Sequence, residues 1–132
     1  MKIYLDFDGT VVEHAYPNMG EPNPMALEVI KKLKDAGHDI ILNTYRANLD
    51  KKLLQDSIDY LNQKVFTDNN VKFVDSKIDP WTFDWDRITT NDVLFIDDIA
   101  QFIPLRPQVK IPGSMVDWVE LDYQLQENGL YN

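Results

Sequence analysis

Short apolar segments alternate along this chain with segments of helical periodicity, and this alternation most restricts its fold. Continuous apolar runs predict strands, at residues 2–5, 38–43, 71–74 and 93–96. Apolar residues recur at helical spacing over residues 24–36 and 49–61. Such alternation implies βαβ crossovers, so we predict an α/β fold with a doubly wound, mostly parallel sheet and helices on both faces.

Turn-forming and capping residues predict the limits of these elements. Pro24 should lie in the first turn of the first helix, Gly37 should end that helix, and Asn48 should cap the second. The remaining expectations are a strand resuming at Val11–Val12, a loop at 14–24, an irregular segment at 75–90 with Trp81 and Trp85, a short strand at Gln108–Ile111, and a final helix capped around Ser114 and Asp117 and running to about Gln126.

Length and composition limit the chemistry that the chain can support. Its 132 residues suit a single domain over 1–132 with its own core. The absence of cysteine excludes disulfides and thiolate ligands, and two histidines are too few for a three-histidine zinc site. A bound metal would therefore need mainly oxygen ligands, which favours Mg²⁺ or a similar hard cation.

The charge pattern bears on partners and location. The formal net charge of −9 weighs against long nucleic acid and anionic membranes. The acids at 6 and 8 interrupt the first apolar run, which does not match a secretory signal, and no window approaches the roughly 20 apolar residues of a membrane span. We therefore expect a cytoplasmic protein with no membrane partner.

Two aspartates, Asp6 and Asp8, follow the first predicted strand at a spacing of two residues. Side chains at i and i+2 of a strand point to the same side, and Gly9 allows a sharp turn beside them. Two carboxylates so close repel each other unless a cation or a shared proton lies between them. The pair predicts a metal-assisted site.

Polar residues also follow two other predicted strands. Thr44 ends the strand at 38–43, and Asp97 with Asp98 ends the strand at 93–96. In open parallel sheets, ligands bind beyond the carboxyl ends of the strands, at the topological switch point. We therefore expect these side chains to converge with Asp6 and Asp8 on one crevice.

The motifs Asp-Phe-Asp-Gly-Thr-Val at 6–11, Leu-Asn-Thr at 42–44 and Phe-Ile-Asp-Asp at 95–98 resemble the first, second and fourth motifs of the haloacid dehalogenase (HAD) phosphohydrolase superfamily. A lysine is expected between the second and fourth motifs, and Lys77 occupies such a position. The resemblance spans nearly the whole chain and implies a Rossmann-like catalytic core.

The resemblance implies a magnesium-dependent phosphatase that hydrolyses a phosphomonoester. Asp6 would be the nucleophile that becomes an aspartyl-phosphate, and Asp8 the general acid and then the general base. Mg²⁺ would be held by Asp6, by the backbone carbonyl of Asp8 and by Asp97, with Asp98 as a direct or water-mediated partner. Its charge would allow several carboxylates to stay ionised together.

Further roles carried by the resemblance concern phosphate and substrate. Thr44 would donate its hydroxyl to a phosphate oxygen, and Lys77 would bridge nucleophile and phosphate, with Lys72 and Arg87 as rival lysine-motif cations. Gly9, Thr10 and Tyr45 would contribute to substrate binding, partly through backbone N–H groups that surround the phosphate. Arg46 would either hold a second anionic group of the substrate or pair with a surface acid.

Many relatives carry a cap domain, but the 36 residues from Asp8 to Thr44 and the 33 from Thr44 to Lys77 leave no room for one. A small capless type implies an open site. It would accept an exposed phosphate on a larger substrate, or a phosphorylated small molecule enclosed by a flap or by a neighbouring subunit of a homo-oligomer. His14 and Tyr16, in the loop after the first motif, are candidates for substrate contact.

Two other functions compete with a phosphatase. One is a non-catalytic protein that binds phosphate or metal and acts as a regulator. The other is a receiver like those of response regulators, which also uses strand-end aspartates, a threonine and a lysine on a doubly wound sheet. A receiver lacks the second acid two residues after its phosphorylated aspartate, so the order of acids here fits it poorly.

Overall fold

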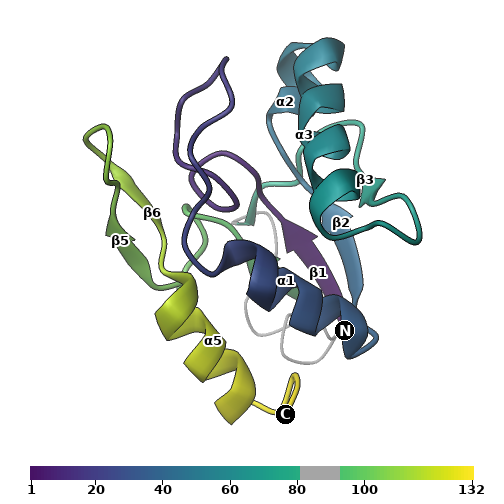
Figure 1. The fold of residues 1–132 in the computed structure, drawn as a ribbon, viewed down its shortest axis with the longest axis vertical. Coiled ribbons are helices and arrows are strands. Elements are labelled where there is room, and N and C mark those ends of the chain that lie inside the picture. Colours follow the sequence, from purple (N-terminus) through teal and green to yellow (C-terminus); the bar gives the residue numbers. More distant parts are fainter. Residues whose placement is uncertain (81–92) are drawn as a thin grey trace.

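A computed structural model describes residues 1–80 and 93–132, and a four-stranded parallel sheet forms its centre (Figure 1). The elements are, in chain order, β1 (Lys2–Leu5), α1 (Ala26–Asp35), β2 (Asp39–Leu42), α2 (Arg46–Leu49), α3 (Lys51–Lys64), β3 (Lys72–Phe73), β4 (Val93–Ile96), β5 (Leu105–Pro107), β6 (Ser114–Val116) and α5 (Trp118–Glu127). The strand order is β3-β2-β1-β4, and β5 and β6 form a separate antiparallel hairpin. The predicted parallel α/β architecture is therefore confirmed.

The core on one face of the sheet contains the apolar sides of α1, α3 and α5. Its members share near-complete burial and include Ile3, Leu5, Val29, Leu33, Leu61, Trp118 and Leu121. On the opposite face the rings of Tyr4 and Phe95 stack with centroids 5.0 Å apart, in a cluster with Ile78 and Ala100. Within residues 1–80 and 93–132, these three helices all cover the first face, so the predicted helices on both faces are not observed there. Trp81, Trp85 and Arg87 lie outside the described residues.

Two helix starts differ from the sequence-based prediction. Helix α1 begins at Ala26 rather than at Pro24, because Met25 precedes it in a left-handed conformation with φ of 67°. The cap of α3 is Asp50, whose carboxylate accepts a hydrogen bond from the Lys52 N–H, and not Asn48. The end of α1 is as predicted, since Gly37 follows its C-cap with a φ of 91°.

Three further expectations were wrong in detail. Val11 and Val12 do not extend a strand, because the N–H groups of residues 10–12 all turn back to the carbonyl of Phe7. The segment Gln108–Ile111 is not a strand but part of the loop that joins β5 to β6. Ser114 lies within β6, and Asp117 alone caps α5 by accepting from the Glu120 N–H.

The carboxyl-terminal elements hold the loop that follows β1. In Figure 1 the hairpin lies on the side of the molecule away from α3, and α5 follows it. The Val116 N–H donates to the Gly9 carbonyl over 2.9 Å. The Asn23 amide donates to the carbonyls of Thr10 and Val116, and the Trp118 indole N–H also donates to Thr10. Residues far apart in sequence therefore fix the backbone of this loop. No helix in the described ranges is both long enough and apolar enough to span a membrane.

Replacing Asn23 with alanine tests this bracing. Asn23 is 3% exposed, so its loss would leave the Val116 carbonyl buried without this donor. We expect Asn23→Ala to lower the free energy of unfolding by about 1–3 kcal/mol in a urea titration. Asn128→Ala is the control, because Asn128 is exposed and bonds only a carbonyl of its own helix. Equal effects from the two variants would contradict the bracing role.

Candidate active site

The register of the sheet brings acids from distant parts of the chain to one edge. Leu5 at the end of β1 pairs with Leu42 of β2 and Ile96 of β4. The residues that follow are Asp6, Asn43 and Asp97, on strands spaced about 4.8 Å apart. The ladder continues into this level, since the Asp6 N–H donates to the Ile96 carbonyl over 2.9 Å. Strand pairing alone therefore places Asp6 beside Asp97.

Asp6, Asp97 and Asp98 form an acidic cluster around Lys77. One carboxylate oxygen from each aspartate lies within 4.8 Å of the others. The Lys77 Nζ lies 3.2 Å from Asp6 Oδ1 and 2.9 Å from Asp97 Oδ2. The Lys77 side chain is only 2% exposed, and Asp6 and Asp97 are buried as well. Four charged groups thus meet where water screens them poorly.

The pKa values of the acids reflect this crowding. Burial raises the pKa of the Asp6 carboxyl well above its usual range, and the nearby Asp97 raises it further, while Lys77 acts in the opposite direction. Burial also raises the pKa of Asp97. Burial would raise the pKa of Asp98 too, but its hydrogen bond with His14 and its contact with Asp97 bring it below the ordinary value. Ionising the whole cluster is therefore unfavourable without a further positive charge.

The acidic cluster fits a hard divalent cation. The buried Asp97 Oδ2 atom forms the ion pair with the Lys77 Nζ, over 2.9 Å, and lacks a further hydrogen-bond donor among the described residues. The other Asp97 oxygen accepts from the Ile99 N–H, which fixes the carboxylate at the strand end. Carboxylate oxygens are the ligands that Mg²⁺ prefers. Asp6, Asp97 and Asp98 could hold such an ion, whereas the Asp8 side chain pairs with Arg46 instead.

The turn after β1 orients Asp6 and requires a glycine at position 9. The Thr10 hydroxyl, fully buried, donates to Asp6 Oδ2 over 3.0 Å. Gly9 adopts a φ of 79°, and a Cβ built there would lie 2.0 Å from the His14 Nε2 atom. That His14 nitrogen lies 2.7 Å from Asp98 Oδ2. The glycine thus allows His14 to reach the acidic cluster.

Asp8 is engaged by Arg46 rather than by the acidic cluster. The Arg46 Nε and one terminal nitrogen donate to the two oxygens of Asp8, each over 2.8 Å. Arg46 is 1% exposed and also donates to the carbonyls of Leu53 and Asn18. One expectation for Arg46 needs correction: it pairs with an acid, but that acid is Asp8 of the candidate site and not a surface acid. Binding of a second anionic group of the substrate by Arg46 stays a prediction.

Two asparagines that the sequence analysis did not assign to the site position Lys77. The fully buried Asn43 side chain accepts from the Ile78 N–H and donates to the Ile78 carbonyl, both over 2.8 Å. The Asn48 side chain accepts from the Lys77 N–H over 2.8 Å. The sequence signal for this contact is the polar Asn43 at the end of an apolar strand. A buried amide at that position must form hydrogen bonds with another segment of the chain.

A cavity of about 230 Å³ opens beside these groups, and its lining includes Asp6, Asp8, Thr44, Lys77 and Asp98. Thr44 is 2% exposed, and its hydroxyl accepts from the Arg46 N–H. The Tyr45 ring packs 4.3 Å from the Lys77 Nζ, and its hydroxyl bonds Asp79. The structure thus brings the predicted residues Asp6, Asp8, Thr44, Tyr45, Arg46, Lys77 and Asp98 to one cavity, with Gly9, Thr10 and Asp97 beside it.

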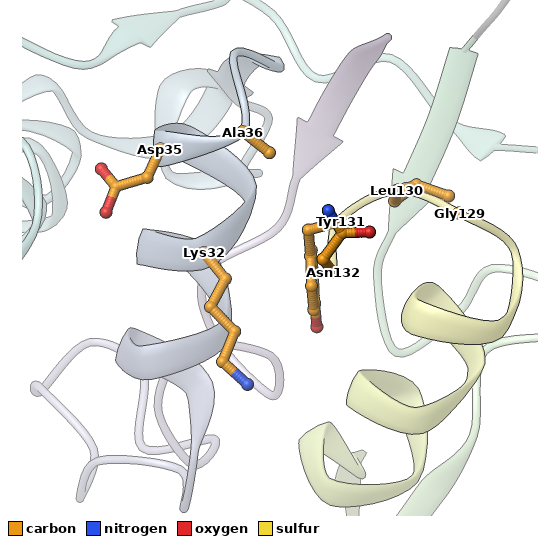
Figure 2. Close-up of a pocket in the computed structure, with 7 residues that line it drawn as sticks. All are labelled: Lys32, Asp35, Ala36, Gly129, Leu130, Tyr131 and Asn132. Carbon is orange, nitrogen blue, oxygen red and sulfur yellow. The ribbon is translucent and has the colours of Figure 1, made fainter.

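A second cavity, of about 600 Å³, lies between α1 and the segment after α5 (Figure 2). Lys32 and Asp35 of α1 line it together with Ala36, the C-cap of that helix, and residues 129–132 line it from the other side. Its lysine is already paired, since the Lys32 Nζ lies 3.2 Å from a carboxylate oxygen of Asp122. The strand-end acids do not line it, so the smaller cavity is the candidate active site.

Comparisons with known proteins give one informative neighbour. The fold is similar to that of a solved structure described as a conserved protein from Bacteroides thetaiotaomicron, with a TM-score of 0.63 and 28% sequence identity. The match covers 97% of this chain and 91% of that one. No protein-family model matches the chain, and no curated protein matches it either. The neighbour supports the α/β fold over nearly the full length.

Gly9→Ala tests the link between the turn and His14. We expect a loss of more than about 1–2 kcal/mol in the free energy of unfolding, since the left-handed backbone alone costs about that much for alanine and the contact with His14 adds to it. Urea unfolding measures the loss. In a His14→Ala background, Gly9→Ala should cost less, because the close contact is gone. The same cost in both backgrounds would contradict the close packing of His14 over Gly9.

Magnesium should stabilise the protein through the acidic cluster. A ligand at 100 times its dissociation constant stabilises the folded state by about 2.7 kcal/mol, so we expect Mg²⁺ to raise Tm by several degrees. Asp97→Asn should remove most of that rise, because it replaces a carboxylate of the cluster with a neutral amide. Asp35→Asn, on the exposed surface of α1, should leave it intact. An equal rise in all three proteins, measured by scanning calorimetry, would contradict a cation site at Asp97.

Proposed function

We propose that this protein is a magnesium-dependent phosphatase of the HAD type, which hydrolyses a phosphomonoester through an aspartyl-phosphate on Asp6. One observation carries the proposal: Asp6, Asp97, Asp98 and Lys77 meet at the carboxyl edge of the sheet, next to a cavity. Phosphoryl transfer needs compensation of charge on the phosphoryl oxygens and a placed nucleophile, and such a cluster can supply both.

The first step would transfer the phosphoryl group to Asp6. An Asp6 carboxylate oxygen forms a bond to phosphorus while the bond between phosphorus and the ester oxygen breaks, and that oxygen takes a proton from the Asp8 carboxyl. Thr10 holds one Asp6 oxygen and Lys77 the other, so the carboxylate is fixed in direction. Such fixation reduces the entropy lost on reaching the transition state.

The second step would release phosphate. The Asp8 carboxylate takes a proton from water, the water oxygen bonds to phosphorus, and the bond from phosphorus to Asp6 breaks. Inorganic phosphate leaves and the Asp6 carboxylate is restored. A Mg²⁺ ion held by Asp6, Asp97 and Asp98 would supply positive charge to the phosphoryl oxygens in both steps. Lys77 would add a second positive charge from within the protein.

Asp8 must change partners to take part. Both of its oxygens are bound by Arg46 in this structure, so proton transfer requires the Asp8 carboxylate to leave at least one of these bonds. Arg46 also donates to Asn18, and its guanidinium lies 5.4 Å from the Tyr16 ring, so the loop of residues 14–24 is linked to the same pair. Substrate contact with that loop would offer a way to release Asp8.

No cap domain covers the site within residues 1–80 and 93–132, so it would be open to substrates. Residues 9–43 contain α1 and β2, and residues 45–76 contain α2, α3 and β3, all of which belong to the sheet and its helical layer. A phosphorylated small molecule, or a phosphate exposed on a larger one, could therefore reach Asp6 without a domain movement.

Replacing the nucleophile tests this function. The wild-type protein should hydrolyse an aryl phosphate with added Mg²⁺, and chelation by EDTA should abolish the activity. Asp6→Asn should lower kcat by on the order of 10³-fold or more, because an amide oxygen is a poor nucleophile. Asp35→Asn serves as the surface control and should retain activity. No hydrolysis by the wild-type protein across a broad panel of phosphate esters would count against the proposal.

The non-catalytic alternative rests on the pair between Asp8 and Arg46. A protein whose second aspartate stayed bound to Arg46 would bind Mg²⁺ and phosphate at Asp6 without turnover. The same hydrolysis assay separates the two functions, provided that Mg²⁺ binding is measured alongside it.

A further inference from the structure

We propose that the substrate carries a single phosphate on a neutral, apolar leaving group about one ring wide, and that the site discriminates against a second anionic group. This inference rests on the proposed phosphatase function and names its substrate class. It is drawn from the cavity beside Asp6, whose walls divide into an apolar rim and a floor of paired charges.

The rim of the cavity is apolar and aromatic. Four of its side chains come from different positions along the chain and are 43–64% exposed: Tyr16, Tyr45, Leu49 and Ile99. Tyr16 and Tyr45 each lie against a cation of the site, the first near Arg46 and the second near Lys77. Solvent-exposed apolar groups around a polar floor are the usual arrangement of a small-molecule pocket. A leaving group that covered them would gain hydrophobic contact.

Every basic side chain that lines the cavity, within residues 1–80 and 93–132, already has a carboxylate partner. Lys77 pairs with Asp6 and Asp97, while Arg46 forms its two-pronged pair with Asp8. The third is His14, which contacts Asp98. Among the described residues that line the cavity, none therefore offers an unpaired positive group to a carboxylate or second phosphate. The phosphoryl group itself would be matched by Lys77 and the divalent ion.

Charge and size both limit the part of the substrate beyond the phosphate. The chain carries a formal net charge of −9, so a second anion on the substrate would be repelled at long range and unpaired on arrival. The cavity of about 230 Å³ is smaller than the roughly 300–1,000 Å³ typical of drug-sized ligands, which suits a phosphoryl group with one ring. Under this inference Arg46 keeps one bond to Asp8 during proton transfer and does not receive a second anionic group.

Two esters that differ by one carboxylate group test the inference. Phenyl phosphate and 3-carboxyphenyl phosphate release phenolates of similar reactivity, so their kcat/KM ratio reports recognition. We expect the neutral ester to be favoured by on the order of tenfold. Equal efficiency, or a preference for the carboxylated ester, would overturn the inference.

A charge added at the rim provides the matched variant. Leu49 is 64% exposed and takes no part in the proposed chemistry, so Leu49→Lys should fold normally. It should improve the relative efficiency for the carboxylated ester by about fivefold, the equivalent of one exposed ion pair. Leu49→Gln, the uncharged control, should lower the efficiency for phenyl phosphate without this gain. Val119→Lys, on the exposed part of α5, should leave the ratio unchanged. An unchanged ratio in Leu49→Lys would overturn the inference.

Binding of phosphonates separates this inference from the proposed function. Phenylphosphonate and 3-carboxyphenylphosphonate cannot be hydrolysed, and calorimetric titration with Mg²⁺ present gives their affinities. If no ester is hydrolysed, the phosphatase proposal fails, but tighter binding of the neutral phosphonate would still support the charge selectivity. Equal affinities would overturn it. Hydrolysis of both phosphate esters at equal rates would support the phosphatase proposal and contradict the proposed substrate class.

Discussion

The repulsion among carboxyl groups at one sheet edge governs the local structure. Strand register forces Asp6 and Asp97 together, and burial makes their ionised forms unfavourable. Lys77 contacts both carboxylates and offsets part of the free-energy cost of ionising them. Asn43 and Asn48 hold the segment that carries Lys77 through hydrogen bonds. Positive charge at its centre stabilises such a cluster, so a divalent ion would suit it, and that ion together with Lys77 would attract a phosphoryl group.

Hydrogen bonds to backbone carbonyls connect the loop after β1 to the carboxyl-terminal hairpin and helix. Asn23 and Trp118 both donate to the Thr10 carbonyl, and the Thr10 hydroxyl in turn holds Asp6. A hairpin and a final helix that carry no acid of the cluster thereby fix the direction of the proposed nucleophile. On the other side of Asp6, the pair of Asp8 and Arg46 connects the site to the loop of residues 14–24 through Asn18.

The parallel sheet and the meeting of its strand-end acids could be predicted from the sequence, because apolar runs that end in aspartate define both strand and edge. The pairing of individual charges could not. Arg46 follows Thr44 by two residues, but its burial against Asp8 depends on how α2 begins. The cap of α3 was misassigned because Asn48 and Asp50 suit that role equally well in sequence, and only the tertiary contact of Asn48 with Lys77 separates them. Local signals do not encode such distant partners.

The central claim is that Asp6 accepts a phosphoryl group beside a divalent ion held by the acidic cluster. A crystal structure of the protein grown with Mg²⁺ and beryllium fluoride tests it most directly, since beryllium trifluoride mimics a phosphoryl group on a carboxylate. The account predicts density for the fluoride adduct on an Asp6 oxygen, with Mg²⁺ bound by Asp6 and Asp97 and Lys77 close to the adduct. An adduct on another residue, or an ion bound elsewhere with Asp6 unmodified, would contradict it.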